Sequence, residues 1–166
     1  MAVGKVIGQT LIYGYPGSFA IQPDQLTVTR VSGDDNEISF GAVVIYNDKN
    51  EVVVPTTTFT MDKFAGIAAR IVKQPADYNN QNVSGYQKNE AVTVFQRGNI
   101  AVKCVKGTPK LNGDVYWVFS ADDPSQVGIS AEAITDKSVK LDGVKFAGDS
   151  DENGVTTVCL LTKQNV

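Results

Sequence analysis

The chain has 166 residues, of which 42% are hydrophobic and 20% are charged, and its net charge is −3. This composition indicates a single globular domain and excludes a disordered chain, and the small net charge argues against a general nucleic-acid-binding protein. No apolar run reaches the roughly 20 residues that a membrane-spanning helix needs, so we expect no membrane contact. The N-terminus lacks the basic and apolar segments of a signal peptide, so we expect synthesis and retention in a cytoplasm.

The first 24 residues are rich in glycine, proline and aromatic side chains. Glycine and proline interrupt this stretch too often for a helix, so we expect residues 1–24 to form an extended N-terminal arm before a β-rich domain over residues 25–166. A buried lead-in to the domain is the alternative. The apolar side chains of the arm need a covering surface, which makes four of them candidates for contact with a partner: Ile12, Tyr13, Tyr15 and Phe19.

Segments of alternating apolar residues follow one another through the rest of the chain. Residues 40–46 and 51–55 flank a polar turn, and residues 91–104 read as a hairpin that turns at Arg97-Gly98-Asn99. Further strands are predicted at residues 25–29, 115–119 and 155–161, with 115–119 in the centre of a sheet. This pattern predicts an all-β fold, a single-domain antiparallel β-sandwich or barrel, with a jelly roll as one form it could take.

Two consecutive segments are less regular. Residues 61–73 match a helix and a strand equally well by periodicity. Residues 74–89 form a polar loop that is long for a compact domain, so we expect it to be functional or ordered by a partner. Its two tyrosines, Tyr78 and Tyr86, join the candidates for partner contact.

The usual catalytic side chains are scarce. The chain has no histidine, which excludes Ser-His-Asp and Cys-His sites, and Cys104 and Cys159 alone cannot build a zinc site. Residues 149–154 match the first half of a calcium-binding loop, but the position that should carry a bidentate glutamate is Leu160, and a hairpin turn explains the same residues. We therefore predict no catalytic, cofactor-binding or metal-binding residues, no cofactor, and no enzymatic activity.

The order of three motifs resembles that of the structural cement proteins, the capsid decoration proteins of tailed bacteriophages. The resemblance covers about residues 60–162, and the matching positions are Phe64, Gly66, Ile67 and Ala68, then Val92, Val94, Arg97, Gly98, Ile100 and Val102, then Gly113, Asp114, Val115 and Tyr116. It implies a strand at residues 64–72, a β-rich fold, attachment to the outside of an icosahedral head, and no catalysis.

We therefore predict a virion structural protein that is made in the cytoplasm of the bacterial host and then binds and stabilises the outer surface of the phage capsid. Its expected partners are the major capsid protein and further copies of itself, as a dimer or trimer, with no nucleic acid and no membrane. The alternative is a carbohydrate- or receptor-binding β-domain of a phage fibre, which would use the exposed aromatic residues among Tyr13, Tyr15, Tyr78 and Tyr86.

Overall fold

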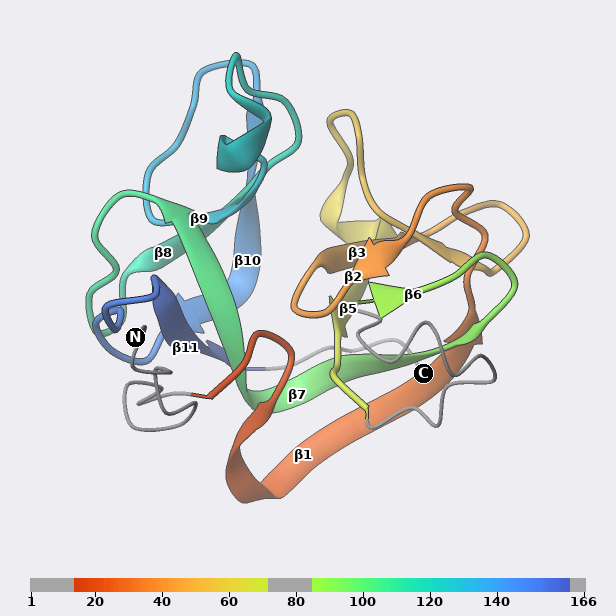
Figure 1. Cartoon of the computed structure of the whole chain (residues 1–166), viewed down its shortest axis with the longest axis horizontal. Coiled ribbons are helices and arrows are strands. Elements are labelled where there is room, and N and C mark those ends of the chain that lie inside the picture. The colour runs from red at the N-terminus through yellow and green to blue at the C-terminus, as the bar shows by residue number, and fades with distance from the viewer. Residues whose placement is uncertain (1–13, 72–84, 162–166) are drawn as a thin grey trace, which may run out of the picture.

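The computed structural model describes residues 14–71 and 85–161, and this part of the chain consists of β-strands, turns and two single-turn 3-10 helices (Figure 1). The predicted all-β fold is confirmed, and no helix in the described ranges is long and apolar enough to span a membrane. The strands are β1 (Phe19–Val31), β2 (Ile38–Ser39), β3 (Val43–Tyr46), β4 (Val52–Val53), β5 (Phe64–Ala68), β6 (Gly85–Tyr86), β7 (Ala91–Lys106), β8 (Asp114–Val118), β9 (Gly128–Ser130), β10 (Ser138–Phe146) and β11 (Val155–Leu160).

Five strands close into a small barrel in the order β7–β9–β8–β10–β11 and back to β7. The β7–β9 pair is parallel and the other pairs are antiparallel, so the barrel is mixed rather than antiparallel throughout. Its interior is apolar, with Trp117, Ile129 and Phe146 among the buried side chains. Closure matters because it leaves these strands without an open edge.

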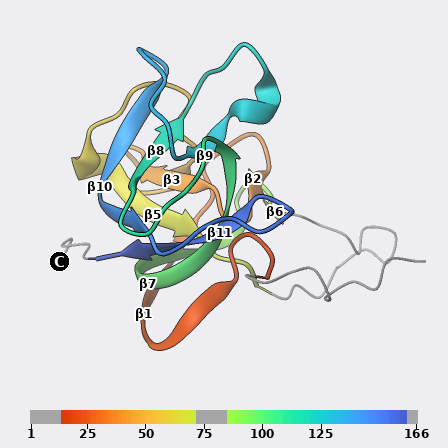
Figure 2. The ribbon, with the colours of Figure 1, turned by 90° about the vertical axis from the view of Figure 1, so that its left-hand side faces the viewer.

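The remaining strands extend the sheet from the first half of β7. There β7 pairs with β1 on one side and with β5 on the other, and β3 and β4 follow β5. The short β2–β6 ribbon lies beside this group, and a second apolar cluster fills the space between them. Figure 1 shows the barrel strands on the left, the β2, β3, β5 and β6 strands on the right, and β7 reaching from one group to the other. Figure 2 shows the same strands side-on.

The predicted hairpin at residues 91–104 is wrong. β7 is one continuous strand of 16 residues, and the chain does not reverse at Gly98. Gly98 has φ +108, and a Cβ there would lie 2.2 Å from the carbonyl oxygen of Asp24. The glycine is needed because β1 crosses β7 closely at this point, and not because the chain turns there.

Several other sequence predictions are confirmed. β3 and β4 pair as a hairpin around the turn at residues 47–50, and β8 lies between β9 and β10. The ambiguous segment at 61–73 begins with one 3-10 turn, Met61–Lys63, and continues as β5. The apolar side chains of the segments predicted as strands at 91–104 and 115–119 lie largely in the core. Phe119 is half-buried, and six others are buried: Val92, Val94, Ile100, Val102, Val115 and Trp117.

Candidate binding surface

The candidate surface includes the N-terminal segment around Gly17, which is hydrogen-bonded to the rest of the fold. Gly17 donates its backbone N–H to the Ala101 carbonyl oxygen at 2.7 Å and accepts from the Arg70 N–H at 2.7 Å. Gly17 has φ +82, and a Cβ there would lie 2.8 Å from the Arg70 nitrogen and 3.0 Å from the Gly41 nitrogen. Only glycine allows three backbones to approach this closely. The segment around Pro16 is therefore held in a defined position.

Tyr15 and Arg70 form an exposed pair on this anchored segment. The Arg70 guanidinium carbon lies 4.2 Å from the centre of the Tyr15 ring, a cation–π contact, and the Tyr15 side chain is 41% exposed. Among the described residues no carboxylate forms an ion pair with Arg70. Tyrosine and arginine are enriched among the residues that dominate binding energy at protein interfaces. This pair can therefore offer a preorganised aromatic face and an unpaired cation to a partner.

Phe19 lies close to the same segment and is 37% exposed. It is the first residue of β1, and its ring stacks on the buried Phe95 ring at a centroid separation of 5.6 Å. β1 thus begins inside the segment predicted as an arm, and the backbones of Phe19 and Ile21 pair with β7. Two other candidates from that segment, Ile12 and Tyr13, lie outside the described residues.

Tyr86 is a core residue in this structure. Its side chain is fully buried, its hydroxyl donates to the Ala69 carbonyl oxygen, and its ring packs edge-on against Phe40 at 5.3 Å. Burial raises the pKa of its hydroxyl above the usual value. A tyrosine held in this way cannot reach a partner, so we remove it from the candidate contacts. Tyr78 lies outside the described residues.

Two of the three segments whose placement is not described, 1–13 and 72–84, join the described structure near this surface. The first described range begins at Gly14, close to the Tyr15–Arg70 pair, and ends at Ile71, directly after Arg70. The second described range begins at β6, where the Tyr86 hydroxyl bonds to the Ala69 carbonyl oxygen. Sequence reasoning treated the predicted arm and the predicted loop as separate features. The pairing of Arg70 with Gly17 and Tyr15 brings their attachment points together.

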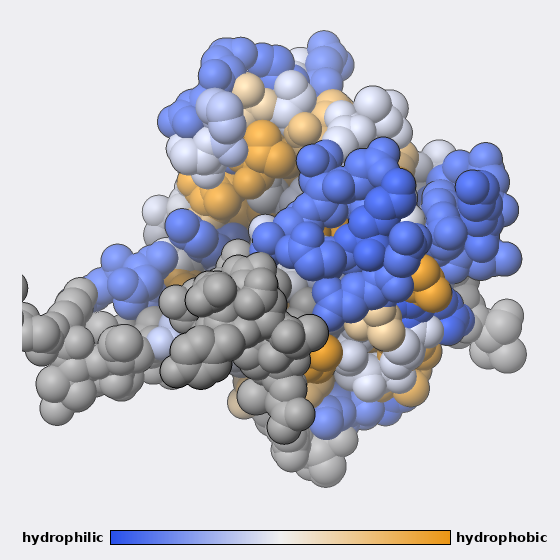
Figure 3. All heavy atoms as spheres, turned by 45° about the vertical axis from the view of Figure 1, so that its right-hand side comes forward, coloured by the Kyte–Doolittle hydropathy of each residue, from blue (hydrophilic) through white to orange (hydrophobic). Residues whose placement is uncertain are grey.

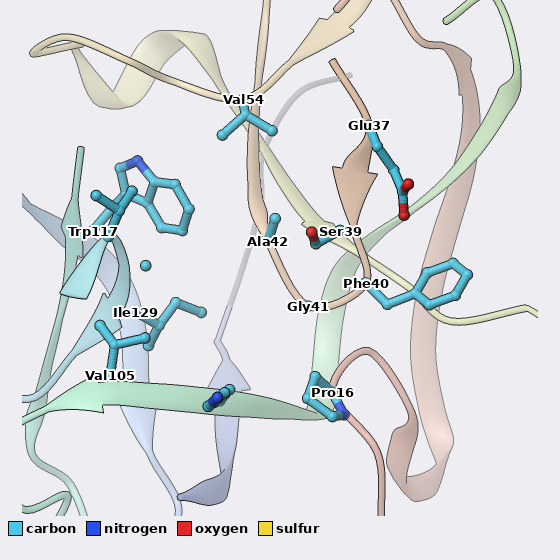
Figure 4. Close-up of a pocket in the computed structure, with 13 residues that line it drawn as sticks. Pro16, Glu37, Ser39, Phe40, Gly41, Ala42, Val54, Val105, Trp117 and Ile129 are labelled. Carbon is cyan, nitrogen blue, oxygen red and sulfur yellow. The ribbon is translucent and has the colours of Figure 1, made fainter. Parts of the chain in front are cut away.

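An apolar cavity of about 320 Å³ opens between the barrel and the flanking strands. Figure 4 shows Trp117 and Ile129 on the barrel side of this space, with Ala42 and Val54 facing them from the flanking chain. Its charged lining residues are Glu37 and Lys103, and a pair of carboxylates does not line it. The cavity thus suits an apolar side chain better than it suits acid–base chemistry.

The acidic turn at residues 149–154 is a hairpin connection between β10 and β11, as the alternative interpretation predicted. One oxygen of the Asp151 carboxylate accepts hydrogen bonds from the backbone N–H groups of Asn153 at 2.8 Å and Val155 at 2.9 Å. Within the described ranges no group of three or more cysteine or acidic side chains is arranged to hold a metal ion. The turn residues therefore shape the backbone.

On the face of the molecule that Figure 3 shows, the hydrophobic side chains appear as patches among hydrophilic ones. Three of the exposed large apolar residues, Phe19, Leu26 and Val31, belong to the single strand β1. Sequence reasoning missed this concentration, because the alternation of threonine and apolar residues in β1 is equally typical of a strand with one buried face.

A comparison with protein-family models decides the family. The model described as "Structural cement protein (E217 gp24/Pam3 gp6)" matches residues 3–161, nearly the whole chain. The chain belongs to this family. The protein is therefore a phage cement protein that decorates and stabilises the capsid as a component of the virion. The prediction that it is not an enzyme is confirmed, because the family is structural.

A solved structure gives a similar fold. A chain in the structure described as "The capsid of Myoviridae Phage XM1" superposes on the cement protein with a TM-score of 0.69 and 16% sequence identity. The match covers 96% of the cement protein and 98% of the other chain. No curated protein sequence matches the cement protein. The fold is thus shared at an identity too low for a direct transfer of contact residues.

Proposed function

We propose that the cement protein binds the major capsid protein through the surface around Tyr15 and Arg70, and that it does so as a homo-oligomer. The observation that carries this proposal is the exposed Tyr15–Arg70 stack, which is fastened to the body of the protein by the backbone bonds of Gly17. An anchored aromatic residue loses little conformational entropy on binding, so its buried area contributes fully to affinity.

The predicted N-terminal arm and the predicted loop at residues 74–89 take part in this proposal. Their attachment points lie next to the Tyr15–Arg70 pair, so both segments would reach the same partner surface. An extended segment can add backbone hydrogen bonds and alternate side-chain contacts to such an interface. Arg70, which directly precedes this region and forms no ion pair among the described residues, would favour an acidic capsid surface, whereas Lys88 is already paired with Asp35.

Oligomerisation would make the reinforcement effective. A subunit that binds only the assembled shell stabilises it by mass action. Two linked copies that contact neighbouring capsid subunits bind with an avidity above that of either contact alone, if both sites can be engaged together. A modest contact surface on each copy is therefore sufficient.

The test is co-sedimentation of the purified cement protein with undecorated phage heads. We expect Tyr15→Ala and Arg70→Ala each to weaken binding about tenfold or more, the range for a truncated interface hot spot. Lys137→Ala is the matched control, because Lys137 is an exposed cation paired with Asp122 at 2.7 Å and lies in the loop before β10, away from this surface. Variants that remain folded and bind like the parent would overturn the assignment of this surface.

A deletion tests the arm separately. It should remove only residues 1–13, because the backbone groups of Gly17 and Ser18 bond to Ala101 and belong to the fold. We expect the shortened protein to keep its melting temperature and to bind heads more weakly. Undiminished binding would show that the arm makes no contribution.

A further inference from the structure

β1 is an outer strand whose second edge is open. Within the described ranges β7 is its only partner strand, and Figures 1 and 2 show β1 at the periphery of the molecule. Leu26 and Val31 on this strand are 46% and 47% exposed. Beyond the strand, the N–H of Gly33 bonds to the Val52 carbonyl oxygen, so β4 closes the edge there. A long apolar edge of this kind is a template for pairing with another strand.

The backbone groups that point outward can be assigned. Ser32 directs both of its groups toward the β7 side, because its N–H bonds to the Glu90 carbonyl oxygen at 2.8 Å and its carbonyl oxygen accepts from Asn89 at 2.9 Å. Successive residues of a strand direct their backbone groups to opposite edges. In the regular part of β1, Thr27 and Thr29 therefore direct their N–H and C=O groups to the open edge, where the Thr29 carbonyl oxygen accepts from the Arg30 side chain at 2.9 Å.

We propose that two copies of the cement protein pair edge to edge through β1, antiparallel, about a two-fold axis that passes midway between Val28 of one copy and Val28 of the other. This proposal rests on the homo-oligomer of the proposed function and names the surface that joins the copies. In this register Thr27 of one copy faces Thr29 of the other, twice. The four outward groups on each copy then form four hydrogen bonds, and the two sheets become one continuous sheet.

The register follows from symmetry. A two-fold axis perpendicular to the sheet keeps each side chain on its own face, so one residue of the strand must lie directly opposite its own copy across the axis. An axis at Thr29 would place Thr27 opposite Val31, next to the point where β4 closes the edge. An axis at Val28 uses Thr27 and Thr29 alone, which are the residues whose outward groups lie inside the open, regular stretch.

The side chains of β1 favour a second copy as the occupant of this edge. Thr27 and Thr29 would form cross-strand threonine pairs, and Leu26 would lie against the aliphatic stem of Arg30. On pairing, the Arg30 side chain would leave the Thr29 carbonyl oxygen to the N–H group of the second copy. The edge is thus complementary to itself in hydrogen bonding and apolar contact.

The first measurement is the mass of the full-length protein in solution without capsids, by sedimentation velocity over a wide concentration range. We expect a dimer for the parent and a folded monomer for Thr29→Pro, because this substitution removes an N–H at the open edge and none that bonds to β7. A monomeric parent would overturn both this inference and the proposed homo-oligomer. A Thr29→Pro protein that stays dimeric would overturn this inference alone.

Cross-linking locates the axis and does not depend on the proline variant. We expect Val28→Cys to give a disulfide-linked dimer under mild oxidation, because residue 28 faces its own copy across the axis. Val31→Cys is the matched control, since it is more exposed than Val28 on the same strand but lies about 20 Å from its own copy in this register. Cross-linking of Val31→Cys and not of Val28→Cys would overturn the proposed pairing, whatever the result of the head-binding assay.

Discussion

Trp117 is the only tryptophan of the chain, and it connects the barrel core to the flanking chain. It is 4% exposed, and its indole N–H donates to the Pro55 carbonyl oxygen at 3.0 Å. We expect Trp117→Ala to lower the free energy of unfolding by about 3–5 kcal/mol, because it removes a large buried side chain next to an existing cavity. Chemical denaturation measures this, and a loss below about 1 kcal/mol would contradict it.

Asp114 accepts hydrogen bonds from two lysines, Lys140 at 2.9 Å and Lys145 at 2.5 Å, and these contacts lower the pKa of its carboxyl group to about 2. Because the pKa in the folded state is below that of the unfolded chain, the carboxylate stabilises the fold above about pH 4 and loses this effect as the pH falls toward about 2. We expect Asp114→Asn to have a lower melting temperature than the parent at neutral pH. Its melting temperature should also change less than that of the parent between about pH 4 and about pH 2. Asp62→Asn, at an exposed position, is the control. Parallel profiles for Asp114→Asn and the parent would disprove the effect.

At the scale of the element, β7 holds the fold together because both apolar clusters depend on it. Val92 and Val94 belong to one cluster, and Ile100 and Val102 belong to the other. Gly98 lies between the half of β7 that packs in one cluster and the half that packs in the other, and its backbone is close to the carbonyl oxygen of Asp24. We expect Gly98→Ala to cost at least about 1–3 kcal/mol through backbone strain, with an added cost from the clash with the Asp24 carbonyl.

Arg97→Ala is the control for Gly98→Ala. Arg97 is the neighbouring residue, and its side chain is exposed and pairs with Asp24 at the surface. Exposed ion pairs contribute about 0–1 kcal/mol. Thermal or urea denaturation of both variants separates the two effects. Equal losses of stability would show that the conformation of Gly98 carries no special cost.

The acidic turn between β10 and β11 gives a second prediction at this scale. Asp151 already stabilises the turn through two backbone N–H groups, and the twelfth position of the loop is Leu160, which is buried. We therefore expect the melting temperature to be the same in EGTA and in millimolar calcium. A strong decrease in EGTA that calcium reverses would make Asp149, Asp151 and Asn153 ligands.

At the scale of the whole molecule, a closed barrel and an open sheet share one strand. The barrel strands have no free edge, whereas the flanking sheet ends at β1. The Tyr15–Arg70 surface and the β1 edge are distinct features, although Gly17 and Phe19 lie only two positions apart along the chain. A barrel with two separate proposed contact surfaces suits a protein that joins neighbouring subunits of a shell.

The sequence by itself determined the all-β class, the strands at β3, β4, β8 and β11, and the turns between them. These features depend on local alternation and on turn residues, which act within a few positions of the chain. The family motifs also indicated a structural role, whereas the lack of histidine excluded only catalytic sites that need one. For the candidate site, the sequence drew attention to Tyr15 and Phe19, which are both exposed, and their contact with a partner stays a prediction.

Only the tertiary structure decided the features that depend on distant segments. A glycine at position 98 is compatible with a turn or with a close approach of another backbone. In the structure it allows the carbonyl oxygen of Asp24, which is 74 residues away, to lie next to β7. Tyr86 lies in a polar stretch that reads as a loop, and it is buried because Ala69 offers a carbonyl oxygen. The second edge of β1 is open because, among the described strands, only β7 pairs with β1. Contacts of this kind bring together residues far apart in the chain, and local periodicity carries no information about them.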